Sequence, residues 1–188
     1  MSFLINESHA KNSKPLWMPY RVGQGSTEIV QFVPVNPVLM PGNGASAVIG
    51  TFTFPRAVTF ASLRGWLNLN ADSSGSTETP TCSLFLSPSG TSLDNTKTDV
   101  ITNITLTASS GGANNYILLD NMYYYGVGAS TTTLNLCVKM TSAHSNTDNL
   151  HPGFADGSVP FSSLPTANSA TWTLTAGKGK ILAIATTN

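Results

Sequence analysis

The sequence predicts an all-β protein: a single antiparallel β-sandwich of roughly eight or nine strands, preceded by an extended N-terminal arm. Three observations predict this fold class. Apolar and polar residues alternate with a period of two over several stretches, which is typical of strands with one buried face. No stretch of ten residues shows the apolar spacing of three and four that indicates a helix. Clusters of Gly, Pro, Asn and Ser separate the alternating stretches, as turns between strands do.

The arm is expected over residues 1–25 and the sandwich domain over residues 26–188. The arm has no steady period, but it carries Trp17, Tyr20 and Arg21. Large apolar side chains each gain about 1.5–3 kcal/mol on full burial, so we expect the arm to lie on its own domain or on a neighbour. A terminus without a partner is the alternative. The first residues lack the pattern of a signal peptide, and no apolar run approaches the ~20 residues that span a bilayer.

The stretch 46–71 is expected to supply the central strands of the core. Its apolar residues first fall on even positions: Val48, Phe52, Phe54, Val58 and Phe60. They then fall on odd positions: Leu63, Leu67 and Leu69. Pro55 predicts a break between two strands. The change of phase predicts a bulge or a new strand near Ser62, because a period of two cannot change phase without an extra residue.

The remaining strands are expected at 27–35, 82–86, 100–106, 116–125 and 131–140, with a hairpin at 170–175 and 180–186. The strand at 116–125 is apolar on both faces apart from Asp120 and Asn121, which predicts a strand that is central or covered on both sides. Residues 142–168 contain no convincing strand and are expected to form a long loop. A long connection favours a jelly-roll-like sandwich over an up-and-down barrel, and an immunoglobulin-like sandwich is the alternative.

Charge argues against two classes of partner. Nine basic and nine acidic residues give a formal net charge of zero, so we expect neither direct nucleic-acid binding nor membrane binding. The chain has two cysteines, Cys82 and Cys137, with no spacing typical of a metal site. Two buried free thiols are expected, with a cross-sheet disulfide as the alternative.

A search for catalytic patterns predicts no enzyme and no cofactor. The chain has no G-x-S-x-G motif and no glycine-rich phosphate loop. One group of residues in the long loop has the chemistry of a divalent-metal site: His144, Asp148, His151 and Asp156. The alternative is a solvated polar loop, and we assign no metal site. Asp72 and Glu78 share the tip of another loop, where acids are usually solvated.

A tyrosine-rich segment offers a candidate binding face. Tyr123 and Tyr125 are expected on one side of their strand and Tyr124 on the other. Exposed tyrosines stack on sugar rings and are common at interfaces. Core packing is the alternative for at least one face. Trp66 is expected on the outer face of its strand and Trp172 in the core.

The segments TFTFPRAVTFASLRGWLNL and CSLFLSPSG, with a surface rich in Ser, Thr, Asn and Gly, resemble the jelly-roll or sandwich domains of tailed-bacteriophage virion proteins. These include capsid decoration (cement) proteins, head fibres and tail-fibre tips. The resemblance covers residues 46–90. It implies a structural role, often as a homotrimer, and it assigns no functional residue.

We therefore expect a structural virion protein that is made in the host cytoplasm and decorates and stabilises the outer capsid surface. Its partners would be the major capsid protein and copies of itself, reached through the arm (Trp17, Tyr20, Arg21) or the long loop. Deleting residues 1–22 should abolish capsid attachment. The alternative is a fibre-type receptor- or carbohydrate-binding module that uses Tyr123, Tyr125 and the 142–168 loop. A shell-forming coat protein is a third option, weakened by the neutral N-terminus.

Overall fold

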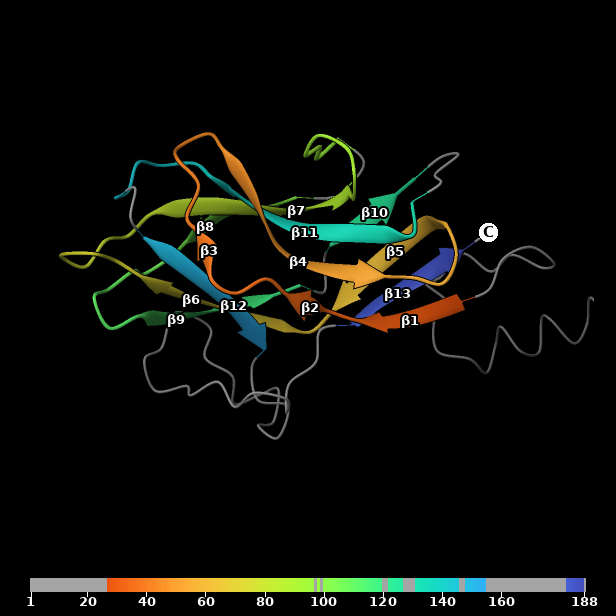
Figure 1. Cartoon of the computed structure of the whole chain (residues 1–188), viewed down its shortest axis with the longest axis horizontal. Helices are drawn as coiled ribbons and strands as arrows, with labels where there is room; N and C mark the ends of the chain where they lie inside the picture. The colour runs from red at the N-terminus through yellow and green to blue at the C-terminus, as the bar shows by residue number, and fades with distance from the viewer. Residues whose placement is uncertain are drawn as a thin grey trace, which may run out of the picture.

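The structure is a computed structural model that describes residues 27–96, 98, 100–119, 122–126, 131–145, 148–154 and 182–187. Every regular element in these residues is a β-strand, and every strand pairs antiparallel with its neighbours (Figure 1). The predicted all-β antiparallel class is therefore confirmed. Within the described part, no helix is long and apolar enough to cross a membrane.

The strands form three sheets. Sheet A has the order β1 (Thr27–Gln31), β13 (Leu182–Thr187), β5 (Val58–Arg64) and β10 (Tyr123–Tyr125). Sheet B has the order β2 (Val33–Pro34), β4 (Ser46–Thr53), β11 (Thr133–Met140), β7 (Thr81–Pro88) and β8 (Ile101–Thr105). Sheet C has the order β3 (Val38–Leu39), β12 (Asn149–Phe154), β6 (Trp66–Asp72) and β9 (Ala113–Leu118).

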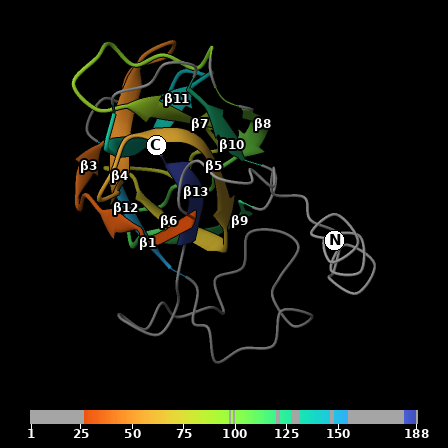
Figure 2. The ribbon, with the colours of Figure 1, turned by 90° about the vertical axis from the view of Figure 1, so that its right-hand side faces the viewer.

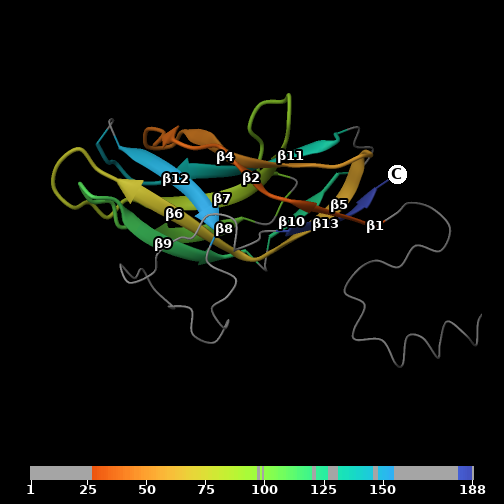
Figure 3. The same cartoon turned by 60° about the horizontal axis from the view of Figure 1, so that its bottom comes forward.

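Sheets A and C together form one layer of the sandwich, and sheet B forms the other (Figure 2, Figure 3). β5 and β6 are separated only by Gly65, whose φ of 137° is left-handed backbone that favours glycine. β9 runs antiparallel to β6 and β10 runs antiparallel to β5, so the layer has paired strands on both sides of the break.

One hydrophobic core fills the space between the layers. Each sheet contributes fully buried side chains, among them Leu63 from sheet A, Phe52, Leu84 and Leu136 from sheet B, and Leu67 and Leu69 from sheet C. The stretch 46–71 supplies core strands, as its alternation predicted, and the structure distributes them over all three sheets. The predicted break at Pro55 is confirmed, because β4 ends at Thr53 and β5 begins at Val58.

The change of phase is real, but its predicted place is wrong by three residues. Opposite β13 the register passes from Phe60 directly to Val58, so Thr59 is the extra residue of a bulge. Ala61 and Leu63 consequently point into the core, while Phe60 leaves it and is half-buried. Phe60 was predicted to lie in the core, and the bulge is the reason that it does not.

The prediction of one central strand at 116–125 is also wrong. The segment divides into β9 and β10, which lie at the edges of sheets C and A. The division lies opposite Gly65: Leu119 N donates to Gly65 O at 3.0 Å, and Leu63 N donates to Met122 O at 3.0 Å. β9 therefore ends and β10 begins on either side of the break between β5 and β6.

Two further segments differ from the prediction. Residues 149–154, expected in a loop, form β12, which pairs with β3 and β6. β13 does not close a local hairpin with the described residues but pairs with β1 and β5, while 170–175 lies outside the described residues. The described residues form thirteen strands rather than eight or nine, because pieces as short as β2 and β3 count separately.

Candidate functional site

Three aromatic side chains gather on the outer face of sheet A and form what we call the aromatic cluster: Phe60, Tyr123 and Tyr125. The ring centroids of Phe60 and Tyr125 are 5.4 Å apart with an edge-on geometry. Those of Phe60 and Tyr123 are 6.2 Å apart and stacked, and the two tyrosine rings are 6.5 Å apart. These separations are typical of favourable aromatic pairs.

The backbone places each ring of the aromatic cluster. The bulge at Thr59 turns Phe60 outward, and the alternation of β10 turns Tyr123 and Tyr125 to the same side. Tyr124 points the other way and is 1% exposed in the core. Burial raises the pKa of Tyr124 above its ordinary value. The predicted division of the three tyrosines between two faces is therefore what the structure has.

β10 is held on both sides. It pairs with β5 through Tyr123 opposite Ser62 and Tyr125 opposite Phe60. On its other side the Thr98 hydroxyl donates to Tyr123 O, and Thr98 forms an isolated bridge with Tyr124. The aromatic cluster therefore rests on fixed backbone and loses little conformational freedom when it binds a partner.

The surroundings of the aromatic cluster are apolar or uncharged. Tyr125 is 50% exposed, and Phe60 and Tyr123 are half-buried. Arg64 lies two outward positions after Phe60 on β5, beyond Ser62, and it is the one charged side chain among the described outward positions of sheet A. The described outward positions of β5 and β10 carry no carboxylate, and the three rings offer surfaces for stacking and apolar contact.

The other residues proposed for partner binding cannot be placed. Trp17, Tyr20 and Arg21 lie outside the described residues, as does Trp172. Phe60 is the member of the aromatic cluster that the sequence reading missed. The change of phase after Pro55 could have indicated it, because that change requires a bulge. It does not show which residue forms the bulge.

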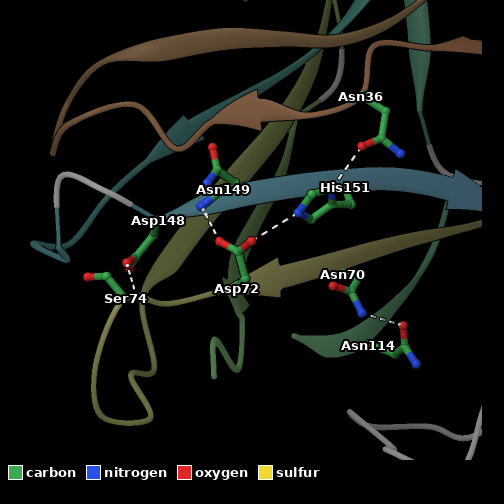
Figure 4. A network of polar contacts seen from close by, with 8 residues as sticks. All are labelled: Asn36, Asn70, Asp72, Ser74, Asn114, Asp148, Asn149 and His151. Carbon is green, nitrogen blue, oxygen red and sulfur yellow. Dashed lines mark hydrogen bonds and ion pairs between the residues drawn. The ribbon is translucent and has the colours of Figure 1, made fainter. Parts of the chain in front are cut away.

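A second polar site lies around β12 (Figure 4). His151 Nε2 donates to Asp72 Oδ2 at 3.0 Å, and its Nδ1 lies 2.8 Å from Asn36 Oδ1. The Asn149 amide donates to Asp72 Oδ1 at 2.7 Å. The hydrogen bond from His151 lowers the pKa of Asp72 below its ordinary value, helped by the Asn149 amide and opposed by partial burial.

Two loops are also joined by carboxylates. The Ser74 amide donates to Asp148 Oδ1 at 3.2 Å, and the Ser145 amide donates to Glu78 Oε2 at 3.0 Å. Asp148 is fully buried, and its Oδ2 has no hydrogen-bond partner among the residues that the structure describes. Asp72 and Glu78 are therefore not simply solvated, contrary to the prediction, because they accept hydrogen bonds from the backbone amides of Asn149 and Ser145.

The proposed metal-site residues do not come together. The two nitrogens of His144 face Pro41 O at 2.6 Å and Ser145 O at 2.7 Å, away from the His151–Asp72 pair. Asp156 lies outside the described residues. Within the described residues no group of three His, Cys, Asp or Glu side chains could hold a metal ion. The polar residues of this region connect loops to strands.

The two cysteines are free and fully buried, so the alternative of a disulfide between them is excluded. Cys82 lies opposite Met140, and Cys137 lies opposite Phe85. Burial raises the pKa of each thiol to about 12. Cys137 faces away from the core cluster. It is still buried, as are Phe85 and Ser87 on the same outer face of sheet B.

The comparisons with known proteins add no relative: no protein family, no curated protein and no solved structure matches this chain.

Proposed function

We propose that this chain is a structural virion protein that binds the outer surface of a capsid and stabilises the shell, with the aromatic cluster as its principal contact. The supporting observation is the aromatic cluster itself: three adjacent rings on paired strands, at outward positions of β5 and β10 that carry no acid in the described part. Buried aromatic anchors supply most of the binding energy at many protein interfaces. The choice of a capsid as the partner rests on the resemblance of residues 46–90 to virion sandwich domains.

The proposal assigns the major capsid protein and copies of the same chain as partners, with a trimer as the assembly that the resemblance implies. A formal net charge of zero supports contacts that depend on apolar surface rather than on nucleic acid or charged lipid. The protein is made in the host cytoplasm and resides on the capsid surface of the virion.

Co-sedimentation with empty capsid shells of the same virus tests the proposal. Tyr125→Ala should weaken binding by roughly 5-fold or more, because truncating a central aromatic at an interface costs more than about 1 kcal/mol. Leu93→Ala is the matched control, since Leu93 is an exposed apolar residue outside the aromatic cluster. Wild-type binding by Tyr125→Ala and by a Phe60→Ala, Tyr123→Ala double variant would reject the aromatic cluster as the capsid contact.

The N-terminal arm is tested in the same assay. We expect deletion of residues 1–22 to abolish attachment while the circular dichroism and thermal transition of the sandwich stay unchanged. Attachment at the wild-type level by the truncated chain would remove the arm from the proposal and leave the aromatic cluster as the contact.

A carbohydrate- or receptor-binding module is the second candidate, and the same aromatic cluster favours it because tyrosine rings stack on sugar rings. Glycan-array binding separates the two functions. Saccharide binding that Tyr125→Ala removes, together with no sedimentation with capsid shells, would replace the decoration function with this one. A shell-forming coat protein is the least supported of the three.

A further inference from the structure

Exposed aliphatic side chains concentrate on one short segment near the start of the described chain. Six large hydrophobic residues are exposed in the described part, and four of them lie between residues 29 and 39. We call these four the aliphatic row: Ile29 (62% exposed), Val33 (60%), Val35 (43%) and Leu39 (60%). All four occupy odd positions, while Phe32, Val38 and Met40 at even positions are buried. The alternation shows that one side of the segment serves the core and the other faces outward.

The segment that carries the aliphatic row lies at the edge of all three sheets. β1, β2 and β3 are terminal strands in the orders of sheets A, B and C, so each has a single neighbour among the described strands (Figure 1). The Val35 amide extends the pairing of β2 by donating to Ile49 O at 3.0 Å. An exposed apolar edge is a template for pairing with another chain.

The segment lacks the features that normally block such pairing. Natural edges often carry lysine, yet Glu28 is the one charged residue between positions 27 and 40. Prolines 34 and 37 stop a continuous ladder beyond β1, so strand pairing is limited to Thr27–Gln31. The outward positions 27, 29, 31, 33, 35, 37 and 39 carry no charge at all.

We propose that the aliphatic row is the contact surface for a second copy of this chain, with β1 pairing antiparallel to β1 of that copy about Ile29. This register is self-complementary. Ile29 faces Ile29, Thr27 faces Gln31, and Glu28 faces Val30, so no carboxylate lies opposite another. Two copies of the uncharged aliphatic row can bury apolar surface against each other. A strongly charged partner would find no complementary charge on the row.

The proposal rests on the self-association that the proposed function includes, and it names the surface and the symmetry. A two-fold contact closes with two copies, whereas the resemblance to virion sandwich domains implies three. The mass of the assembly therefore separates the two ideas without any capsid being present.

Sedimentation velocity of the full chain, over about a 100-fold range of concentration, is the first measurement. The wild-type chain should convert from monomer to dimer as concentration rises. Ile29→Lys should weaken the dimer by roughly 100-fold, because two ammonium groups then oppose each other across the two-fold axis. Leu93→Lys is the matched control and should associate as the wild-type does, since Leu93 is exposed away from the aliphatic row.

A charge-swap mixture tests the register. Ile29→Lys and Ile29→Glu should each be monomeric alone, and an equal mixture should form a heterodimer because opposite charges then face each other. Oxidised Ile29→Cys should give a disulfide-linked dimer, while Leu93→Cys should not. The native thiols are fully buried and do not interfere.

Each other outcome counts against the proposal. A dimer that Ile29→Lys leaves intact would exclude the aliphatic row but keep self-association, and a trimer would exclude the two-fold register. A wild-type chain that stays monomeric would overturn both. If Ile29→Cys in that monomer reacts with a thiol reagent only after residues 1–22 are removed, the chain's own arm covers the row.

Discussion

Phe52→Ala and Phe60→Ala should differ strongly in their effect on stability, although the sequence pattern places both residues in the same phase. Phe52 is fully buried, and its ring lies 5.4 Å from that of Phe32 between the layers. Phe60 is half-buried on the outer face of sheet A, because the bulge at Thr59 turns it away from the core. The comparison therefore tests the position of the bulge.

The expected magnitudes follow from burial. Removing a fully buried Phe ring costs about 3–5 kcal/mol, since the lost transfer free energy adds to the free energy of the cavity. Removing a half-buried ring leaves no closed cavity and costs about 1–2 kcal/mol, including its ring–ring contacts with Tyr123 and Tyr125. With a urea slope of about 2 kcal/mol per M, the two midpoints should differ by about 1 M.

Equilibrium urea unfolding, followed by tryptophan fluorescence and far-UV circular dichroism, gives both values. Phe54→Ala is a useful third variant, because Phe54 is 3% exposed and should behave as Phe52 does. Equal destabilisation by Phe52→Ala and Phe60→Ala would refute the reasoning. It would place Phe60 in the core and the change of phase nearer Ser62.

Three further predictions concern single features. Gly50→Ala should destabilise the fold by about 1–3 kcal/mol in urea unfolding, because a Cβ there would lie 2.1 Å from the Phe32 ring; wild-type stability would contradict the packing. The folded-state pKa of Asp72 is lowered by its pairing with His151. The pairing therefore stabilises the fold fully above the unfolded pKa of about 3.9, and this stabilisation is lost as the pH falls through the lower folded-state pKa. Asp72→Asn should therefore flatten stability against pH on the acid side, and an unchanged profile would reject the pairing. Both buried thiols, with pKa values raised to about 12, should resist a thiol reagent until urea unfolds the chain; rapid labelling of the folded chain would show that they are accessible.

Local alternation predicted the fold class and most of the strands. Segments such as β4 and β11 keep one face in the core, so their side chains alternate in the sequence as they do in space. The bulge at Thr59 is different, because its position depends on the pairing with β13, more than a hundred residues away in the sequence. The order of strands in the sheets has the same origin and leaves no local pattern.

The polar residues were the least predictable part. Asn115 is fully buried, yet nothing in its surrounding sequence distinguishes it from the polar residues of a turn. In the structure its amide Nδ2 donates to Leu69 O at 2.9 Å, and its Oδ1 accepts from the Thr107 amide at 2.7 Å. A buried amide is stable only when such partners are in place. These partners come from other segments, so the sequence around Asn115 does not reveal them.

The two proposed contacts lie at opposite edges of sheet A, and this separation predicts that they act independently. β13 and β5 stand between β1 and β10, so Ile29 and the Tyr123–Tyr125 pair are about 14 Å apart at the usual spacing of strands. Tyr125→Ala should therefore leave the dimer unchanged in sedimentation velocity.

Loss of the dimer should still weaken attachment to a capsid, for a reason that involves no contact with it. A dimer offers two aromatic clusters to a repetitive surface, and the second binds at a raised effective concentration. Ile29→Lys should thus reduce capsid binding of the full chain while leaving the affinity of a single cluster intact. The apparent affinity should be measured on surfaces that present capsid binding sites sparsely and on surfaces that present them densely. For the wild type the two affinities should differ, and for Ile29→Lys they should be the same. If the variant and the wild type respond to density alike, dimerisation has no part in attachment.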